Sequence, residues 1–194
     1  MTRRSIDLLA DTNPNWVNVV MDQFDEFLCD HANCERKASA LAMSLVVKYP
    51  NRTRIIPTLI DVAREELEHF HQVYALMESR GLTLVHDTQD PYVNGLLGVM
   101  RHGREERFID RMLVSSLVEC RGAERFGLVA EALTDPELKR FYTELYKCEK
   151  KHGHQFVDLA LKEAPPDLVY PRLQQLAEHE ADIMLSLEWR PSLH

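Results

Sequence analysis

The sequence predicts an all-α fold in which two long helical hairpins are joined by a crossover. Long segments place apolar residues at positions i, i+3, i+4 and i+7, while few segments alternate as strands do. Only 7 glycines interrupt the 194 residues, so long uninterrupted helices are expected. With 45% hydrophobic residues, the chain can bury one core but is too short for two ordinary domains, so we expect a single domain over residues 1–194.

The first half of the chain contains the first predicted hairpin. One or two short helices are expected within 3–20, followed by a long helix over about 22–49 that the YPN turn ends. A second long helix is expected over about 53–80, where Gly81 stops it. The segment 82–91 is then predicted to be a connection that crosses to the second hairpin.

The second half repeats this pattern. Thr134 or Asp135 can cap a helix and Pro136 suits its first turn, so TDPE separates two long helices. The run PPDLVYP is expected to break the chain before a last helix. The predicted helices are 91–103, 104–133, 136–163 and 171–188. Two hairpins with one long crossover are the connectivity of a ferritin-like four-helix bundle, here with peripheral helices.

Two overlapping Glu-x-x-His pairs occur in REELEHFHQV, residues 64–73. Glu66 lies three residues before His69, and Glu68 lies three before His71. Residues three apart share a helix face, whereas residues two apart point about 200° from each other, so only one pair can face a core.

An internal repeat distinguishes the two pairs. The fourth long helix contains EKKHGHQF (149–156), which aligns with ELEHFHQV (66–73). Glu66 and His69 correspond to Glu149 and His152, but the position of Glu68 is taken by Lys151. The sequence therefore favours the first pair as the functional one.

Two further glutamates complete a predicted metal site. Glu35 lies 31 residues before Glu66, and Glu119 lies 30 residues before Glu149, as two similar antiparallel hairpins require if their carboxylates share one height. Four carboxylates and two neutral imidazoles suit two ions of Fe or Mn. The predicted metal-binding and catalytic residues are Glu35, Glu66, His69, Glu119, Glu149 and His152.

Neighbouring polar residues are assigned elsewhere. Glu124 is the alternative third-helix ligand, but it lies five residues from Glu119 and so on another face. Cysteines adjacent to predicted ligands are expected to be small buried side chains, since adjacent helical residues point about 100° apart. His31, one turn before Glu35, is placed on a helix flank or behind the ligands. The cysteines are Cys34, Cys120 and Cys148, and the other flank histidines are His71, His154 and His179.

Small residues around Glu35 and Glu119 leave space beside the predicted metals. Ala38, Ser39 and Ala42 follow the first, and Ser115 and Ser116 precede the second. This favours oxidation of an organic substrate, which needs a pocket. The same ligands also permit a ferritin-like protein that oxidises and stores iron or detoxifies peroxide.

Three segments carry a resemblance to a known family: VAREELEHFHQVYALMESRGL, LVECRGAERF and CEKKHGHQF. From about Trp16 through the last helix, the chain resembles the tRNA-(2-methylthio-N6-isopentenyladenosine) hydroxylases, which are ferritin-like non-haem di-iron monooxygenases. The resemblance implies that the six predicted residues bind two iron ions. It also implies that O2, two electrons and two protons are used to hydroxylate the isopentenyl group of the modified adenosine beside the anticodon.

The resemblance implies two partners, tRNA and an electron donor. No flavin or iron–sulfur motif is present, so a separate reductase is expected. The formal net charge, 23 minus 31, is −8, which argues against a general nucleic-acid binder and requires a local basic patch. For each basic candidate, a place on a solvated helix face is an equally good explanation. The candidates for tRNA phosphate contacts are Arg52, Arg54, Arg101, Arg104, Lys150 and Lys151.

The sequence also predicts the cellular compartment. The four cysteines show no CxxC spacing and the N-terminus shows no apolar signal sequence, so a reduced, cytoplasmic protein is expected. Apolar stretches such as ALAMSLVV stop at about eight residues, well short of the roughly 20 needed to span a bilayer. No membrane association is predicted.

Overall fold

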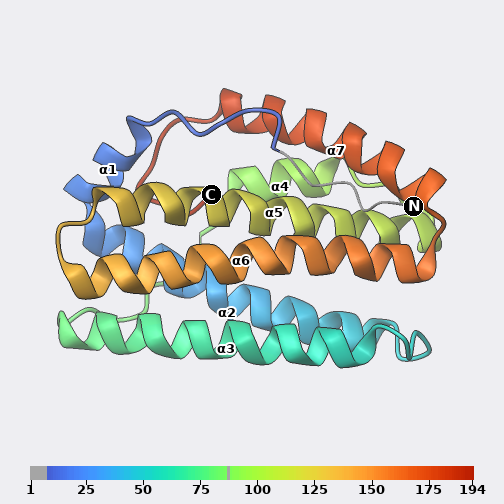
Figure 1. The fold of residues 1–194 in the computed structure, drawn as a ribbon, viewed down its shortest axis with the longest axis horizontal. Coiled ribbons are helices and arrows are strands. Elements are labelled where there is room, and N and C mark those ends of the chain that lie inside the picture. The colour runs from blue at the N-terminus through green and yellow to red at the C-terminus, as the bar shows by residue number, and fades with distance from the viewer. Residues whose placement is uncertain (1–7, 87) are drawn as a thin grey trace. The chain divides into compact units, whose positions relative to one another are not determined.

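The computed structural model describes residues 8–86 and 88–194, and these contain seven helices and no strand (Figure 1). The predicted all-α class is therefore confirmed. None of the helices in this described part is long and apolar enough to cross a membrane. The helices are α1 (Trp16–Asp22), α2 (Phe24–Lys48), α3 (Ile56–Ser79), α4 (Pro91–Gly98), α5 (Arg104–Ala132), α6 (Pro136–Glu163) and α7 (Pro166–Ser186).

The chain divides into two compact units. One holds 18–88 with 190–193, and therefore α2 and α3. The other holds α4 to α7 with the segment before Asn18 and the terminal His194. The expectation of a single domain stays a prediction.

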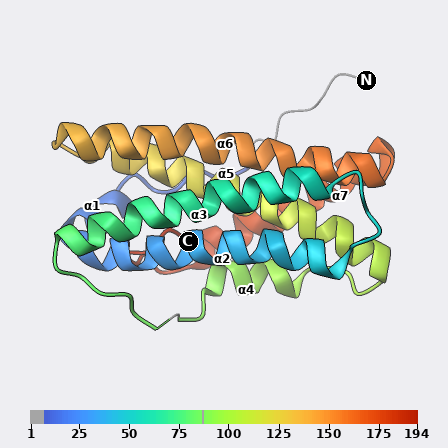
Figure 2. The ribbon, with the colours of Figure 1, turned by 90° about the horizontal axis from the view of Figure 1, so that it is seen from below.

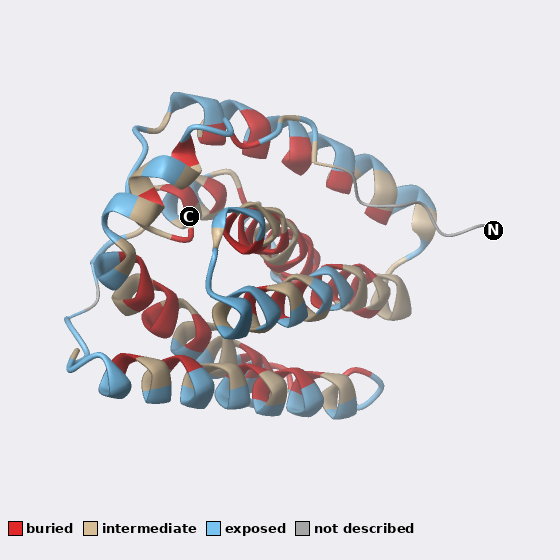
Figure 3. Ribbon diagram, turned by 60° about the vertical axis from the view of Figure 1, so that its left-hand side comes forward, coloured by how far each residue is buried: buried red, intermediate tan, exposed pale blue. Residues whose placement is uncertain are grey.

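In the first unit, α2 and α3 pair along their lengths as a helical hairpin (Figure 2). Phe27, Leu28 and Leu45 of α2 are buried, as are Leu59 and Val73 of α3, at the spacing of one helix face. Burial along one side and exposure along the other recurs on the long helices (Figure 3). The apolar periodicity of the sequence thus specifies which face of each helix is covered.

The end of α3 follows from Gly81, whose φ of 72° lies in the left-handed region that glycine occupies without strain. The Leu82 N–H donates to the Met77 carbonyl (2.9 Å) and the Gly81 N–H donates to the Glu78 carbonyl (3.0 Å). These are the two hydrogen bonds of a Schellman cap. The predicted stop at Gly81 therefore has a backbone cause.

One hydrogen bond sets the height of α2 against α3. The Ser39 hydroxyl donates to the Ala63 carbonyl at 2.8 Å. Ser39 lies one turn after Glu35, and Ala63 lies three residues before Glu66. The bond therefore holds the two glutamates of this hairpin at neighbouring heights.

In the second unit, α5 and α6 form the other hairpin. The Asp135 carboxylate caps α6 by accepting from the Glu137 N–H (2.8 Å) and the Leu138 N–H (2.9 Å), with Pro136 in the first turn. The cap and the proline occupy the positions that the sequence predicts.

The close approach of α5 to the backbone of α6 at Gly153 fixes the height of one helix against the other. The Ser116 hydroxyl donates to the Gly153 carbonyl at 2.7 Å. A Cβ at Gly153 would lie 2.6 Å from the Cys120 sulfur, so only glycine fits there without a shift. The contact lies beside the predicted ligands Glu119 and His152.

The peripheral helices are attached to α5 by a buried ion pair. The Arg121 guanidinium donates to Glu180 of α7 at 2.9 Å, and both side chains are 0% exposed. Burial alone would lower the pKa of Arg121, but the hydrogen bonds and charge of Glu180 raise it overall. The Tyr92 hydroxyl of α4 also donates to Glu180 (2.8 Å), and burial together with the Glu180 charge raises the pKa of Tyr92.

The last helix differs from its prediction, because α7 begins at Pro166 rather than at residue 171. The expectation that PPDLVYP breaks the chain was wrong for all of this run after Pro165, because α7 includes it from Pro166 through Pro171. Pro166 occupies the first turn, where a backbone N–H has no partner within the helix. Pro171 lies inside the helix, and its ring is exposed to solvent. The next residue, Arg172, binds α5 and thus holds this turn in place.

The N-terminal helices also differ from expectation. Within the described residues, 8–15 are irregular and the first helix begins at Trp16. Residues 3–7 of the predicted range lie outside the described part of the chain.

Asp110 forms a second buried charge cluster. The Arg172 guanidinium donates to it at 2.8 Å and Arg101 at 2.7 Å, while Arg172 also donates to the Val99 carbonyl. Burial alone would raise the pKa of Asp110, but the hydrogen bonds from Arg172 and Arg101 outweigh it and hold the pKa below the ordinary value of 3.8.

We expect Asp110→Asn to lower the free energy of unfolding by about 3 kcal/mol at neutral pH, because two guanidinium groups lose their anionic partner. Because the native pKa is depressed, this contribution is present above pH 3.8 and is lost as the pH falls through the native pKa. Urea unfolding of both proteins across acid and neutral pH measures it. Asp182→Asn, an exposed change on α7, is the control and should cost less than about 0.5 kcal/mol. A deficit that does not shrink in acid would contradict the assignment.

Candidate metal centre

The α2/α3 cluster, defined as Glu35, Glu66 and His69, brings together the three ligands predicted in the first hairpin. One donor atom from each lies within 4.8 Å of the others. The His69 Nδ1 is 3.4 Å from the Glu35 Oε2 and 3.7 Å from the Glu66 Oε2. Glu35 is 3% exposed and Glu66 is 1% exposed. Two carboxylates and one imidazole thus converge in a nearly dry environment.

His31 is also part of this environment. It is fully buried on α2, and its Nε2 lies 2.7 Å from the Glu35 Oε1. The sequence left two positions open for His31, on a helix flank or behind the ligands. In the structure it lies directly behind Glu35.

The α5/α6 cluster, defined as Glu119, Glu149 and His152, repeats the arrangement in the second hairpin. One donor atom from each lies within 4.8 Å of the others. The His152 Nδ1 is 3.0 Å from the Glu149 Oε2, and both side chains are buried, while Glu119 is half-buried. The donor types match those of the α2/α3 cluster one for one.

The alternative pair beside the α2/α3 cluster points elsewhere. Glu68 and His71 are exposed, and the Glu68 Oε1 accepts a hydrogen bond from Gln72 at 2.9 Å. The repeat and the burial pattern therefore select the same pair, Glu66 with His69.

The donor set suits a metal. Burying a carboxylate without a compensating charge costs several kcal/mol, and a cation compensates several carboxylates at once. Carboxylate oxygens combined with imidazole nitrogens suit Fe or Mn ions, whereas soft thiolate sites suit other metals. The residues present in each cluster thus fit one ion of this class.

The other polar neighbours make contacts of their own. Glu124 accepts hydrogen bonds from the Thr12 N–H (2.7 Å) and the Thr12 hydroxyl (2.6 Å). All four cysteines are half-buried thiols. Burial and the neighbouring Glu119 charge raise the pKa of Cys120 to about 12, and the Cys148 sulfur lies 3.8 Å from the His152 Nε2.

Sequence reasoning missed the two buried ion-pair clusters, of Arg121 with Glu180 and of Asp110 with its arginines. One signal was present: Glu180 falls within the apolar stripe of α7, between Ala177 and Met184. A carboxylate in an apolar stripe needs a partner, but the sequence does not identify that partner, which lies 59 residues away.

The predicted tRNA contacts have different surroundings. Arg101 is held by Asp110 (2.7 Å), and the Arg52 guanidinium lies over the Tyr49 ring, 5.6 Å from its centroid. The four others are exposed and extend from their helices or turns: Arg54, Arg104, Lys150 and Lys151.

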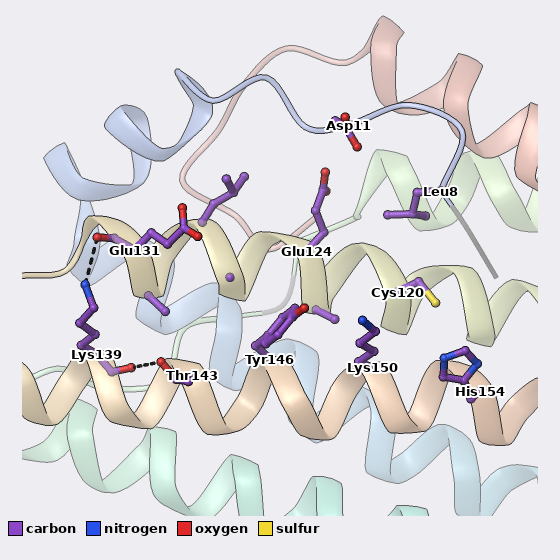
Figure 4. Close-up of a pocket in the computed structure, with 14 residues that line it drawn as sticks. Leu8, Asp11, Cys120, Glu124, Glu131, Lys139, Thr143, Tyr146, Lys150 and His154 are labelled. Carbon is purple, nitrogen blue, oxygen red and sulfur yellow. Dashed lines mark hydrogen bonds between the residues drawn. The ribbon is translucent and has the colours of Figure 1, made fainter. Parts of the chain in front are cut away.

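A pocket of about 670 Å³ lies on the second unit between α5, α6 and the segment that begins at Leu8 (Figure 4). Lys139, Tyr146 and Lys150 of α6 line one wall. Asp11 and Glu131 line the other side, and the lining includes small residues of α5 such as Gly127. The wall formed by α6 thus combines an aromatic ring with two cations.

Comparison with known proteins identifies a family and several relatives of this chain. The family model described as tRNA-(MS2IO6A)-hydroxylase (MiaE) matches residues 1–194. A protein of Pseudomonas putida named tRNA 2-(methylsulfanyl)-N(6)-isopentenyladenosine(37) hydroxylase is 36% identical over 145 residues, covering 75% of this chain and 70% of the relative. A Salmonella typhimurium protein of the same name is 32% identical over 133 residues, covering 69% of this chain. That match spans about half, 48%, of the Salmonella relative's length.

A solved structure, a Synechococcus protein described as having aldehyde deformylating oxygenase activity, superposes with a TM-score of 0.90 at 35% identity. The superposition covers 96% of this chain and 94% of the other. It confirms the ferritin-like fold that the order of hairpins and crossover predicts. The match of the family model over the full length, together with two relatives above 30% identity, shows that the chain belongs to the tRNA-(MS2IO6A)-hydroxylase (MiaE) family.

Proposed function

We propose that this tRNA hydroxylase works through two iron ions that the donors of the α2/α3 and α5/α6 clusters bind. The chain is an enzyme of its family, a hydroxylase of 2-methylthio-N6-isopentenyladenosine in tRNA. The proposal adds the metal, the oxidant and the electron source. One atom of O2 enters a C–H bond of the isopentenyl group, and the other leaves as water with two electrons and two protons.

One observation carries the proposal: each hairpin brings together the same trio of two glutamates and one histidine, of which at least two are buried. The trios have the same order along the chain, with Glu-x-x-His on the second helix and a lone Glu on the first. Two bound iron ions would supply the oxygen activation and electron transfer that no protein side chain provides. Mn would suit the same donors.

The side chains of the clusters hold and orient the donors. His69 lies between two carboxylates, at 3.4 Å from Glu35 and 3.7 Å from Glu66. The Ser39 and Ser116 hydrogen bonds fix the height of each hairpin beside its cluster. Burial of Glu35, Glu66, Glu149 and His152 would keep bulk water from the bound metals, which protects a strongly oxidising step from side reactions.

The electrons come from a separate reductase in this proposal, and the enzyme acts in the cytoplasm, where tRNA is modified.

The exposed surface of α6 is the proposed tRNA contact. Five basic residues face solvent between positions 139 and 151, against Glu144 as the exposed acidic residue of that stretch. This α6 basic surface adjoins the pocket that Lys139, Tyr146 and Lys150 line (Figure 4). Lysines beside an aromatic ring are the pattern that single-stranded RNA contacts use. The basic residues are Lys139, Arg140, Lys147, Lys150 and Lys151.

The remaining basic candidates are ranked by their contacts. Arg54 and Arg104 are exposed and stay candidates for phosphate contacts, as does Arg52 beside Tyr49. Arg101 is the weakest candidate, because its guanidinium is held by Asp110.

The first prediction concerns metal content. Glu66→Gln and Glu149→Gln should each weaken iron binding by more than about tenfold. Loss of a residue that only hydrogen-bonds to a metal ligand already lowers affinity by about that factor, and loss of a ligand should cost more. Elemental analysis after anaerobic loading with Fe(II) should give two irons per chain for the unmodified protein and fewer for either variant. Glu68→Gln and Glu144→Gln are matched controls on the same helices, since both residues are exposed. Full iron content in Glu66→Gln would contradict the proposed ligand set.

The second prediction concerns activity. Protein loaded with Fe(II), then given O2 and a chemical reductant, should convert isopentenyl-bearing tRNA to the hydroxylated nucleoside, as measured by mass spectrometry of digested tRNA. Omission of O2 should abolish the product, whereas omission of the reductant should limit it to a single turnover, because two bound Fe(II) ions supply the two electrons only once. Two bound irons with unmodified tRNA would remove the substrate assignment while leaving the metal site. Rapid turnover of peroxide, or iron storage in large shells, would indicate the alternative functions.

The third prediction concerns tRNA binding. Lys150→Glu should weaken binding to an anticodon stem-loop and reduce the magnitude of the slope of log K against log salt by about one, because one phosphate contact is lost. Arg64→Glu on the exposed face of α3 changes the net charge equally and is the control. Fluorescence anisotropy over a salt series measures both. Equal effects of the two variants would indicate a general charge effect rather than a contact at the α6 basic surface.

A further inference from the structure

Among the differences between the two hairpins, one lies a helical turn before the lone glutamate of each cluster. His31 precedes Glu35 by four residues, and Ser115 precedes Glu119 by four. Both side chains are buried, at 0% and 4% exposed. The six donors are matched in type between the hairpins, whereas the side chain behind the lone glutamate is not.

His31 constrains the Glu35 carboxylate. A carboxylate only accepts hydrogen bonds, so the 2.7 Å contact requires a hydrogen on the His31 Nε2, which donates to the Glu35 Oε1. The other oxygen, Oε2, is the one that faces His69, at 3.4 Å. One oxygen of Glu35 is thus engaged from behind, and the other is directed toward the remaining donors of the cluster.

The His31 ring is itself held in place. It is fully buried and packs beside Phe27 on the same helix, with ring centroids 6.0 Å apart. Fixed partners of metal ligands raise metal affinity because the ligand loses less freedom on binding. A buried imidazole of fixed orientation meets that requirement.

Ser115 gives no comparable support. Among the residues that the structure describes, its buried hydroxyl makes no hydrogen bond. The side chain is also too short to reproduce the span of an imidazole. The hydrogen bond that His31 makes therefore has no counterpart from position 115.

We propose that His31 is a positioning residue that makes the two metal sites unequal. It orients Glu35, so the α2/α3 cluster binds its ion more tightly and fills first, and the α5/α6 cluster binds the second ion more weakly. The inference rests on the proposed di-metal function and adds an order of loading to it.

The test is titration of metal-free protein with Mn(II) alone, with free Mn(II) measured by electron paramagnetic resonance and heat measured by calorimetry. The unmodified protein should show two binding steps of different affinity. His31→Leu, which keeps bulk but removes the donor, should weaken the tighter step by about 10- to 100-fold and leave the weaker step unchanged. His31→Gln retains an N–H donor and should recover part of that affinity. Ser115→Ala, at the corresponding position, should change neither step.

The outcomes separate this inference from the function on which it rests. Unmodified protein that binds fewer than two Mn(II) ions overturns both. Two ions bound with unchanged affinities in His31→Leu overturn the positioning role alone. An equal loss in both steps, or the same loss in His31→Gln as in His31→Leu, would indicate a general effect on folding and would also overturn it. Thermal unfolding of each metal-free variant shows whether the fold is retained.

Discussion

Burial of acidic side chains within each helical hairpin is the constraint on which the rest of the structure depends. Glu35, Glu66 and Glu149 are each at most 3% exposed, although isolated buried carboxylates are costly. The hairpins must therefore bring these groups to matched heights, where one cation can compensate several of them. The serine hydrogen bonds between paired helices fix those heights. The peripheral helices are secured separately, by buried ion pairs that compensate their own charges.

The sequence predicted the parts of the molecule that depend on local pattern. Apolar spacing located the long helices, and the repeat of Glu-x-x-His selected Glu66 over Glu68. It failed at Pro171, because a proline in an early turn costs one backbone hydrogen bond that tertiary contacts of α7 offset. It also failed to find the partner of Glu180, because a contact across 59 residues leaves no local signal. The difference between His31 and Ser115 was visible in the sequence, but its meaning required the 2.7 Å contact to Glu35.

The net charge of −8 and membership of a tRNA-modifying family are compatible for a physical reason. Net charge counts buried carboxylates together with exposed ones, but an RNA strand interacts with the field at the surface it approaches. Glu149 is hidden on one side of α6, while lysines occupy the exposed side. A single helix can therefore be acidic toward the core and basic toward solvent.

Gly153 has a consequence for how the geometry of the α5/α6 cluster is inherited. Its missing side chain lets Cys120 and Ser116 approach, immediately beside His152. The spacing of two helices at the height of three donors is thus set by a residue that donates nothing. A larger residue at this position would push α5 and α6 apart. The separation of the donors would then change although every one of them was retained. A relative with all six donors but a bulkier residue here would therefore be a poor guide to the chemistry of this chain.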